Sequence, residues 1–308
     1  MKKYTRLFAV LFVFVMLLSG CGSKETAGTG AETVVEPDTD VTEESSAGTG
    51  DAGTEEVSAT LKRLREQGYI AIASSNDAPL SYIDVETNEY TGVDGEIFKD
   101  LMKRLGVPEV RMKTVAFENL LIELNNKSVD MVVDAMYIKP ERQEIALFTN
   151  VWYSEGDCLI VKSDSDIKSL ADLKDKSVGA QKGTAFLEIA QYWESEGLIK
   201  DLTIMGSQSE LMLSVNTGKI DACVTDSIIA GYTLTQDSSL DLKLAEDYVA
   251  DSKGNIGAAL RFEDKDFCAE VNAVLDEMKE DGTLMKYLEQ YGMDENSFVG
   301  VEEGKTVQ

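Results

Sequence analysis

The sequence predicts an α/β protein built of two lobes, each with a mostly parallel sheet flanked by helices. In the first half of the folded region, short apolar runs alternate with stretches of helical spacing in the order β-α-β-α-β, which favours a parallel sheet. The second observation is an internal repeat, because the segment 121–133 is echoed by the segment 212–224. Both copies read as the last turns of a helix, a tight turn and a buried strand. The two lobes are therefore expected to share one topology.

The elements of the first half follow from the spacing of apolar residues and from glycine and proline. In chain order, the pattern predicts a strand at 69–73, a turn at 92–95, a helix from Glu96 to Gly106, a strand at 110–115, a helix after Phe117 and a strand at 131–133.

The second half continues the alternation of strands and helices. The pattern predicts strands at 157–162, 177–181, 199–205 and 256–260, a capped helix start at Ser169, a helix from Thr184, and two final helices at 267–278 and 284–291. Residues 294–308 are expected to be a poorly packed tail.

Composition excludes several classes of function. The 308 residues carry a formal net charge of −27, which disfavours nucleic acid and anionic lipid headgroups as partners. The chain has no His, which excludes Ser-His-Asp and Cys-His catalysis and the common zinc-protease site. Cys158, Cys223 and Cys268 lie among apolar neighbours, so we expect free buried thiols rather than a disulfide. We expect no metal site and no cofactor.

The N-terminus has the features of a targeting segment. Lys2, Lys3 and Arg6 precede an apolar run at 7–18 that is too short to span a bilayer, and Leu18-Ser-Gly-Cys21 follows. This resembles the bacterial lipoprotein signal, which implies that residues 1–20 are removed and that Cys21 carries the lipid. An ordinary secretory signal is the alternative. Residues 21–60 are acidic and lack aromatic residues, so we expect a flexible linker between anchor and folded body.

The segment from Asp130 to Arg142 is the best candidate for a binding element. It combines a buried strand, Asp134 at the end of that strand, and Pro140 at the start of a short helix that carries Arg142. Ligands bind at the carboxyl ends of strands in open α/β sheets, and an Arg guanidinium grips a carboxylate with two donors. The alternative is a solvated surface arginine.

A set of short motifs, each weak alone, gains weight from its order and spacing. They are Ala78-Pro79, Gly92-Val-Asp-Gly95, the helix after Phe117, Lys127-Ser-Val-Asp130, Ile138-Lys-Pro-Glu-Arg142, Phe148-Thr149, Leu170-Ala-Asp-Leu173, Gly183-Thr184, Gly218-Lys-Ile-Asp221 and Asp281-Gly-Thr283. With these motifs the chain resembles the extracytoplasmic solute-binding proteins of amino-acid ABC transporters, family 3, over about residues 69–292. The resemblance implies the two-lobed periplasmic-binding-protein fold of type II, with a two-strand hinge and the ligand in the cleft. It places 61–154 and 250–308 in lobe 1 and 155–249 in lobe 2.

The same resemblance assigns roles to individual residues. Arg142 would grip the α-carboxylate of a ligand and Asp226, from the other lobe, its α-ammonium group, while Phe117 would stack on its side chain. An ordinary core residue is the alternative for Phe117, and a solvated strand end for Asp226. The implied ligand-binding set further includes Ser74, Asp77, Asp134, Ala135, Tyr137, Gln181, Thr184 and Ala185.

These features predict a non-enzymatic receptor, anchored at the extracytoplasmic face of the membrane, that captures a zwitterionic solute and passes it to an ABC importer. The alternatives are a dehydratase-like enzyme on the same fold, with Asp77, Asp134 or a Tyr as acid and base, and a solute sensor. If Asp77 and Asp134 both point inward, the ligand should carry an extra positive charge near Phe117 and Trp152. If Asp134 turns to solvent or is held by Lys139, a neutral polar amino acid is expected.

Overall fold

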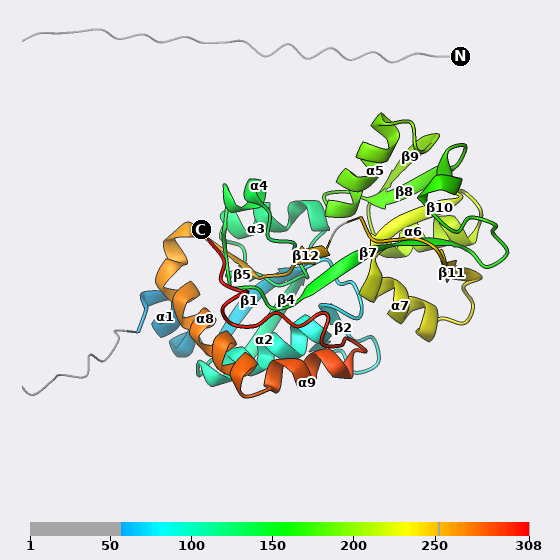
Figure 1. The fold of residues 1–308 in the computed structure, drawn as a ribbon. Coiled ribbons are helices and arrows are strands. Elements are labelled where there is room, and N and C mark those ends of the chain that lie inside the picture. The colour runs from blue at the N-terminus through cyan, green and yellow to red at the C-terminus, as the bar shows by residue number, and fades with distance from the viewer. Residues whose placement is uncertain (1–56, 252, 308) are drawn as a thin grey trace, which may run out of the picture. The chain divides into compact units, whose positions relative to one another are not determined.

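The computed structural model describes residues 57–251 and 253–307, and Figure 1 shows their arrangement. The predicted signal peptide and most of the predicted linker lie outside these residues. Helices are α1 (Ala59–Gln67), α2 (Val93–Arg104), α3 (Leu120–Asn125), α4 (Pro140–Gln143), α5 (Ala185–Ser195), α6 (Gln208–Asn216), α7 (Ser227–Gln236), α8 (Lys265–Glu280) and α9 (Thr283–Gln290). Short 3₁₀ turns are η1 (Phe117–Asn119), η2 (Leu170–Leu173) and η3 (Phe262–Asp264).

The strands form two main sheets, one in each lobe, and the α/β two-lobed fold is confirmed. The first has the order β4-β1-β5-β13-β6, and the second has the order β11-β7-β10-β8-β9 with β12 beside β7. The strands are β1 (Tyr69–Ser74), β2 (Tyr82–Ile83), β3 (Tyr90–Thr91), β4 (Glu109–Thr114), β5 (Met131–Val132), β6 (Leu147–Phe148), β7 (Ser154–Lys162), β8 (Ser177–Gln181), β9 (Asp201–Met205), β10 (Ala222–Asp226), β11 (Leu242–Leu244), β12 (Lys253–Asn255) and β13 (Ala259–Leu260).

Each sheet is mixed, with a parallel part and antiparallel additions, whereas the sequence predicted mostly parallel sheets. In the first sheet β4, β1 and β5 are parallel, while β13 runs antiparallel to β5 and β6. In the second, β10, β8 and β9 are parallel, and β7 runs antiparallel to β10 and β11. The repeated segments end in β5 and β10, which are the central strands of their sheets. Their carboxyl ends therefore occupy equivalent places in the two lobes.

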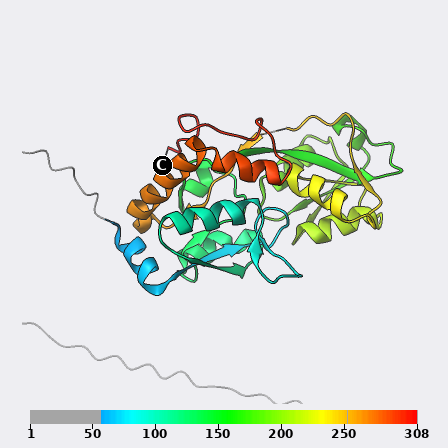
Figure 2. The same ribbon diagram turned by 90° about the horizontal axis from the view of Figure 1, so that it is seen from below.

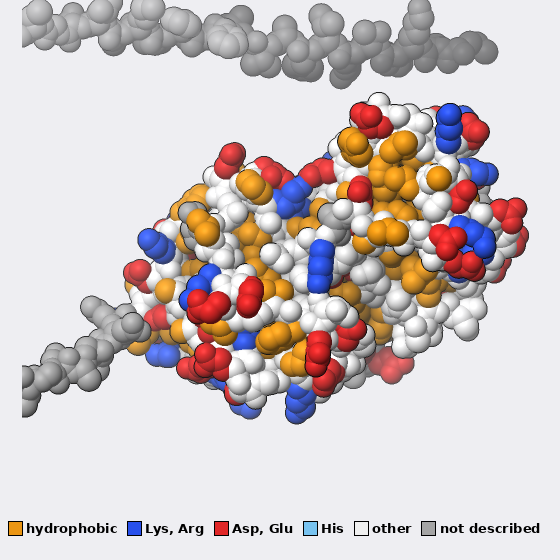
Figure 3. All heavy atoms as spheres, viewed as in Figure 1, with side chains coloured by type: hydrophobic (Ala, Val, Ile, Leu, Met, Phe, Trp, Pro, Cys, Tyr) orange, Lys and Arg blue, Asp and Glu red, His pale blue; other side chains and the backbone are white. Residues whose placement is uncertain are grey.

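Helices cover the first sheet on both faces, and alternate residues of its strands pack against different layers. Ile72 of β1 and Met131 of β5 belong to the large core that includes Phe98 of α2. Their neighbours Ala73 and Val132 pack with α3 in a second cluster. On the α2 side, α8 and α9 lie beside α2, as the view from below shows (Figure 2). On the face drawn in Figure 3, basic side chains are scattered singly among acidic ones.

Strand β7 connects the two lobes. Its first residues pair with β12, with Glu155 opposite Gly254, and its later residues pair with β10 and β11 in the second sheet (Figure 1). β12 leads back toward the first lobe, where Ile256 bonds to Tyr153. These two strands form the two-strand hinge. The lobe boundaries at 154/155 and 249/250 stay predictions.

Two predicted elements differ in the structure. Helix α1 begins at Ala59, inside the segment assigned to the linker, because Ser58 caps it and Leu61 and Leu64 are buried. The predicted turn at 92–95 is the first turn of α2, whose start is fixed by Gly92. At φ +109°, a Cβ on Gly92 would lie 2.2 Å from the backbone oxygen of Leu80.

The C-terminal segment is packed against the first lobe, so the prediction of a poorly packed tail is wrong. The carbonyl of Gly304 accepts from Val151 N at 2.7 Å, and the carbonyl of Ser297 accepts from Ser154 N at 2.8 Å. These are backbone hydrogen bonds, which leave no periodic apolar pattern in the sequence. The segment thereby supports the chain at the start of the hinge.

Candidate functional site

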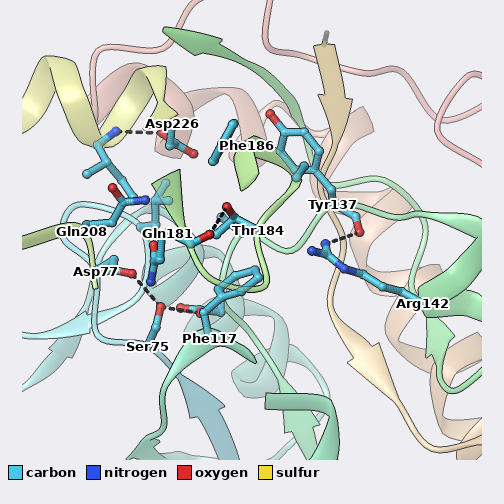
Figure 4. Close-up of a pocket in the computed structure, with 15 residues that line it drawn as sticks. Ser75, Asp77, Phe117, Tyr137, Arg142, Gln181, Thr184, Phe186, Gln208 and Asp226 are labelled. Carbon is cyan, nitrogen blue, oxygen red and sulfur yellow. Dashed lines mark hydrogen bonds between the residues drawn. The ribbon is translucent and has the colours of Figure 1, made fainter. Parts of the chain in front are cut away.

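A pocket lies between the two lobes, and both lobes contribute side chains to its wall (Figure 4). It encloses about 400 Å³ of space, its mouth included. Its lining residues are Ser75, Asp77, Leu80, Phe117, Asp134, Ala135, Tyr137, Arg142, Gln181, Thr184, Ala185, Phe186, Gln208, Asp226 and Ile229.

Arg142 is a buried cation whose donors reach carbonyl groups. Its side chain projects from α4, with Nη1 donating to Tyr137 O at 2.8 Å and Nη2 donating to Gly183 O at 3.0 Å. The guanidinium lies 5.5 Å from the centre of the Phe117 ring, a cation–π contact. Burial lowers its pKa. No carboxylate of residues 57–251 and 253–307 forms an ion pair with it, so its charge is available to an anionic ligand group.

The opposite lobe presents a carboxylate and a helix N-terminus. Asp226 ends β10 and caps α7, because its Oδ1 accepts from Ile228 N and Ile229 N at 2.7 and 2.8 Å. Its Oδ2 takes no part in this cap. Burial raises the pKa of Asp226, and the neighbouring Glu155 side chain and the two backbone bonds oppose the rise. Thr184 caps α5, where the first amide groups favour an anion beside Arg142.

Two further carboxyl groups, Asp77 and Asp134, line the pocket from the first lobe. Ser75 Oγ lies 2.7 Å from Asp77 Oδ2 and 2.6 Å from Asp134 Oδ2, so one hydroxyl bridges them. Ser74 Oγ lies 2.7 Å from Asp134 Oδ1. Burial raises the pKa of Asp77 to about 6, and burial together with Asp77 raises the pKa of Asp134 to about 8. The pocket thus holds three carboxyl groups for one guanidinium.

The loop between β5 and α4 is held in an unusual backbone conformation. Ala135 has φ +43°, in the left-handed region that non-glycine residues rarely occupy. Asp94 of α2 stabilises it by accepting from Ala135 N at 2.6 Å, and Tyr153 Oη donates to the other oxygen of Asp94 at 2.7 Å. Asp94 and Tyr153 therefore fix the direction in which Asp134 enters the pocket.

A fourth acidic side chain, Glu155, lies behind the pocket wall in the hinge. It is buried, and neither of its carboxyl oxygens has a hydrogen-bond donor among the described residues. Burial and the neighbouring Asp226 raise its pKa well above the usual range. The region around Asp226 is thus strongly acidic.

The lobes touch one another at the edges of the pocket. Besides the bond from Arg142 to Gly183, the rings of Tyr137 and Phe186 meet edge to face at 5.7 Å. Lys139 forms an ion pair with Glu188 of the other lobe. At Gly183, φ is +82° and a Cβ would lie 2.9 Å from Glu118 Cα. The cleft is therefore closed, and its closure depends on the absence of a side chain at position 183.

Ten of the sequence-predicted site residues line this one pocket. They are Asp77, Phe117, Asp134, Ala135, Tyr137, Arg142, Gln181, Thr184, Ala185 and Asp226. Ser74 does not line it, because β1 turns that side chain inward to Asp134 while the next residue, Ser75, faces the cavity. Trp152 is also outside, stacked on Phe98 in the core with Nε1 donating to Thr149 Oγ1. Lys139 does not hold Asp134, since it pairs with Glu141 and Glu188.

Sequence reasoning missed five lining residues. They are Ser75, Leu80, Phe186, Gln208 and Ile229. Ser75 and Phe186 are adjacent to predicted residues, so the loop and the helix start were identified one position away. Gln208 had a usable signal, because Ser207 and Glu210 mark the start of α6 in the sequence. Leu80 and Ile229 carry only apolar side chains, which nothing in the sequence separates from core residues.

Two lobes on a two-strand hinge, with an unpaired guanidinium and an opposing carboxylate in the cleft, define a binding protein for small zwitterions. The model of the bacterial extracellular solute-binding proteins, family 3, matches residues 70–294, and the chain belongs to this family. The chain is 31% identical to the arginine-binding extracellular protein ArtP of Bacillus subtilis over 216 residues, 69% of this chain and 81% of that protein. It is 27% identical to the L-cystine-binding protein TcyJ of Escherichia coli K12, covering 75% and 85%.

A solved structure of an amino-acid-binding protein has a similar fold. The ancestral amino acid-binding protein AncCDT-1, described as a precursor of cyclohexadienyl dehydratase, has a TM-score of 0.67 and 28% identity, covering 76% of this chain and 99% of that one. The protein is thus an extracytoplasmic amino-acid-binding component of an ABC importer, which captures its solute and delivers it to the transporter. Within the described residues, none of the helices has the length and apolar character needed to span a membrane.

The close approach at Gly183 gives a prediction about closure. Gly183→Ala should weaken amino-acid binding about tenfold or more, because its Cβ meets the backbone of Glu118 only when the lobes close. Gly197→Ala is the matched control, since Gly197 also has a left-handed φ, +67°, but no atom lies within 4 Å of its Cβ position. Calorimetric titration of both variants compares them, and equal losses of affinity would attribute the effect to backbone strain rather than to closure.

Proposed function

We propose that the captured solute is an α-amino acid with a positively charged side chain, of the arginine type. The supporting observation is the charge balance of the pocket, in which Asp77, Asp134 and Asp226 face a single cation, Arg142. A neutral amino acid brings one carboxylate and one ammonium group, which leaves the first-lobe carboxyl pair with protons as its only counter-charges. Buried carboxylates need a cation or a proton.

The binding pose follows from the positions of these groups. The α-carboxylate lies between the Arg142 guanidinium and the N-terminus of α5, and the α-ammonium group binds Oδ2 of Asp226. The side chain then extends past Phe117, and its terminal cation reaches Asp77 and Asp134. Because the two main-chain charges of the ligand are held by different lobes, the ligand stabilises the closed cleft. The relative ArtP, described as arginine-binding, agrees with this assignment.

An enzymatic function is the second candidate, favoured by one observation. The pKa of Asp134 is raised to about 8, so this carboxyl carries a proton near neutral pH and has the form of a general acid. The binding role is preferred because the pocket offers Arg142 and Asp226 for a whole zwitterion. Incubation of the protein with arginine, followed by recovery of the amino acid unchanged, separates the two.

A panel of amino acids tests the charge assignment. L-Arginine should raise the melting temperature of residues 57–308 most, because binding only to the folded state stabilises it. L-Citrulline, which has nearly the same shape without the charge, should bind at least about 100-fold more weakly, or about 2.7 kcal/mol. A preference for glutamine, serine or citrulline over arginine and lysine would refute the cationic assignment and leave the binding function intact.

The membrane attachment is a further part of the proposal. We propose that Cys21, which follows Leu18-Ser-Gly, is lipidated and anchors the protein at the outer face of the membrane. Cys21→Ser should move the protein from the membrane fraction to the soluble fraction, as followed by immunoblotting. Cys158→Ser serves as control because Cys158 is a buried free thiol. A Cys21→Ser protein that still sediments with membranes would show a different attachment.

A further inference from the structure

The contacts around Asp77 and Asp134 contain more hydrogen bonds than the hydroxyl groups there can supply with protons. Four oxygen–oxygen contacts form a chain. Asp77 Oδ2 lies 2.7 Å from Ser75 Oγ, Ser75 Oγ lies 2.6 Å from Asp134 Oδ2, Asp134 Oδ1 lies 2.7 Å from Ser74 Oγ, and Ser74 Oγ lies 2.6 Å from the Ser81 carbonyl. Each contact has the length of a hydrogen bond and needs one proton. Ser74 and Ser75 together supply two.

The donor and acceptor of each hydrogen bond follow from the Ser81 carbonyl, which is the last group of this series of contacts. The Ser81 carbonyl has no proton, so Ser74 must donate to it, and Asp134 must then donate from Oδ1 to Ser74. Because Asn76 N also donates to Ser74 Oγ, at 3.0 Å, that hydroxyl has no further capacity. Ser75 donates to Asp134 Oδ2, and Asp77 must donate to Ser75. The chain is complete only when both carboxyl groups are protonated.

The surroundings of the two carboxyl groups agree with this count. Asp134 is only 5% exposed. The charged or titratable groups around the pair are Asp226 from β10, Tyr90 from β3, and Asp94 from α2, which accepts from the amide of Ala135 beside Asp134. Tyr137 and Arg142 line the same pocket. Gln181 of β8 offers a hydrogen bond to Asp77. Arg142 donates to carbonyl groups instead of to either carboxyl group. In the closed cleft, protons are therefore the available counter-charges for Asp77 and Asp134.

We propose that Asp77 and Asp134 hold two exchangeable protons in the closed cleft and that a bound cation displaces the one on Asp134, so that capture of a cationic amino acid releases a proton. This inference rests on the proposed preference for a cationic side chain. In the exchange, the O–H bond of the Asp134 carboxyl breaks, the proton passes to bulk water or buffer, and the carboxylate pairs with the ligand cation. A neutral ligand leaves the proton in place.

The sign of the pH dependence follows from the pKa values of the two carboxyl groups in the protein without ligand. The pKa of Asp134 is raised to about 8 and that of Asp77 to about 6. A cation binds the ionised form, so affinity for arginine should be highest above pH 8 and fall as pH decreases. Below pH 8 the decrease should approach about tenfold for each pH unit, because one proton must be removed for each ligand bound. Affinity for citrulline should stay constant over the same range.

Calorimetric titration at pH 7 in phosphate and in Tris buffer tests the proposal on the full chain. The two buffers differ in ionisation enthalpy, so the difference in measured heat counts the protons released. We expect L-arginine to release close to one proton and L-citrulline to release none. Arginine binding without proton release, and with the same affinity at pH 6 and pH 8, would overturn the inference but not the cationic preference. Absence of arginine binding would instead refute the proposed function.

Two variants identify the source of the proton. Asp134→Asn keeps the shape of the side chain and removes its titration, so proton release on arginine binding should disappear and the pH dependence should flatten. Glu86→Gln makes the same charge change at an exposed carboxylate outside the pocket and should retain the wild-type release. If Asp134→Asn, shown to melt cooperatively, still releases a full proton at pH 7, the assignment to Asp134 is wrong. If that variant does not fold, the comparison of arginine with citrulline in the wild type decides.

Discussion

The site depends on a buried guanidinium that the fold places in a closed cleft without a carboxylate partner. Removing a charge from water costs several kcal/mol unless it is paired or hydrogen-bonded. The fold offsets part of this cost with the carbonyls of Tyr137 and Gly183 and with the face of Phe117. In the proposed pose, a ligand carboxylate offsets the rest. Binding at Arg142 would then be favourable because the free protein leaves this charge incompletely satisfied.

The topology divides the charges so that binding and closure are one process. Arg142, Asp77 and Asp134 belong to the lobe whose sheet contains β5, and Asp226 ends the central strand of the other sheet. The lobes are joined at β7 and β12, where Glu155 is buried opposite Gly254. A zwitterion that contacts both lobes can stabilise only the closed arrangement. Under the proposed function, the acidic side chains select which zwitterion fits, since closure removes the water that would otherwise screen them.

Much of the fold and site could be predicted from the sequence because the patterns there are local. Strand β5, the start of α4 at Pro140 and the repeat ending in β10 placed Arg142 and Asp226 correctly in one cleft. The orientation of Asp134 could not be predicted, because it depends on Ala135 being held by Asp94 from α2. The C-terminal segment was missed because backbone hydrogen bonds hold it. Trp152 was misplaced because an aromatic residue near a hinge has the same local pattern whether it faces a core or a cleft.

The role of Arg142 is tested most directly by comparing L-arginine with agmatine, the same molecule without its carboxylate, on the wild type and on Arg142→Ala. If Arg142 grips the carboxylate, the wild type should bind arginine more tightly by about 2–5 kcal/mol, the cost of leaving one buried charge unpaired. In Arg142→Ala that preference should largely disappear. Calorimetry measures all four affinities. A wild type that binds agmatine as tightly as arginine, or a variant that keeps the full preference, would show that Arg142 does not bind the ligand carboxylate.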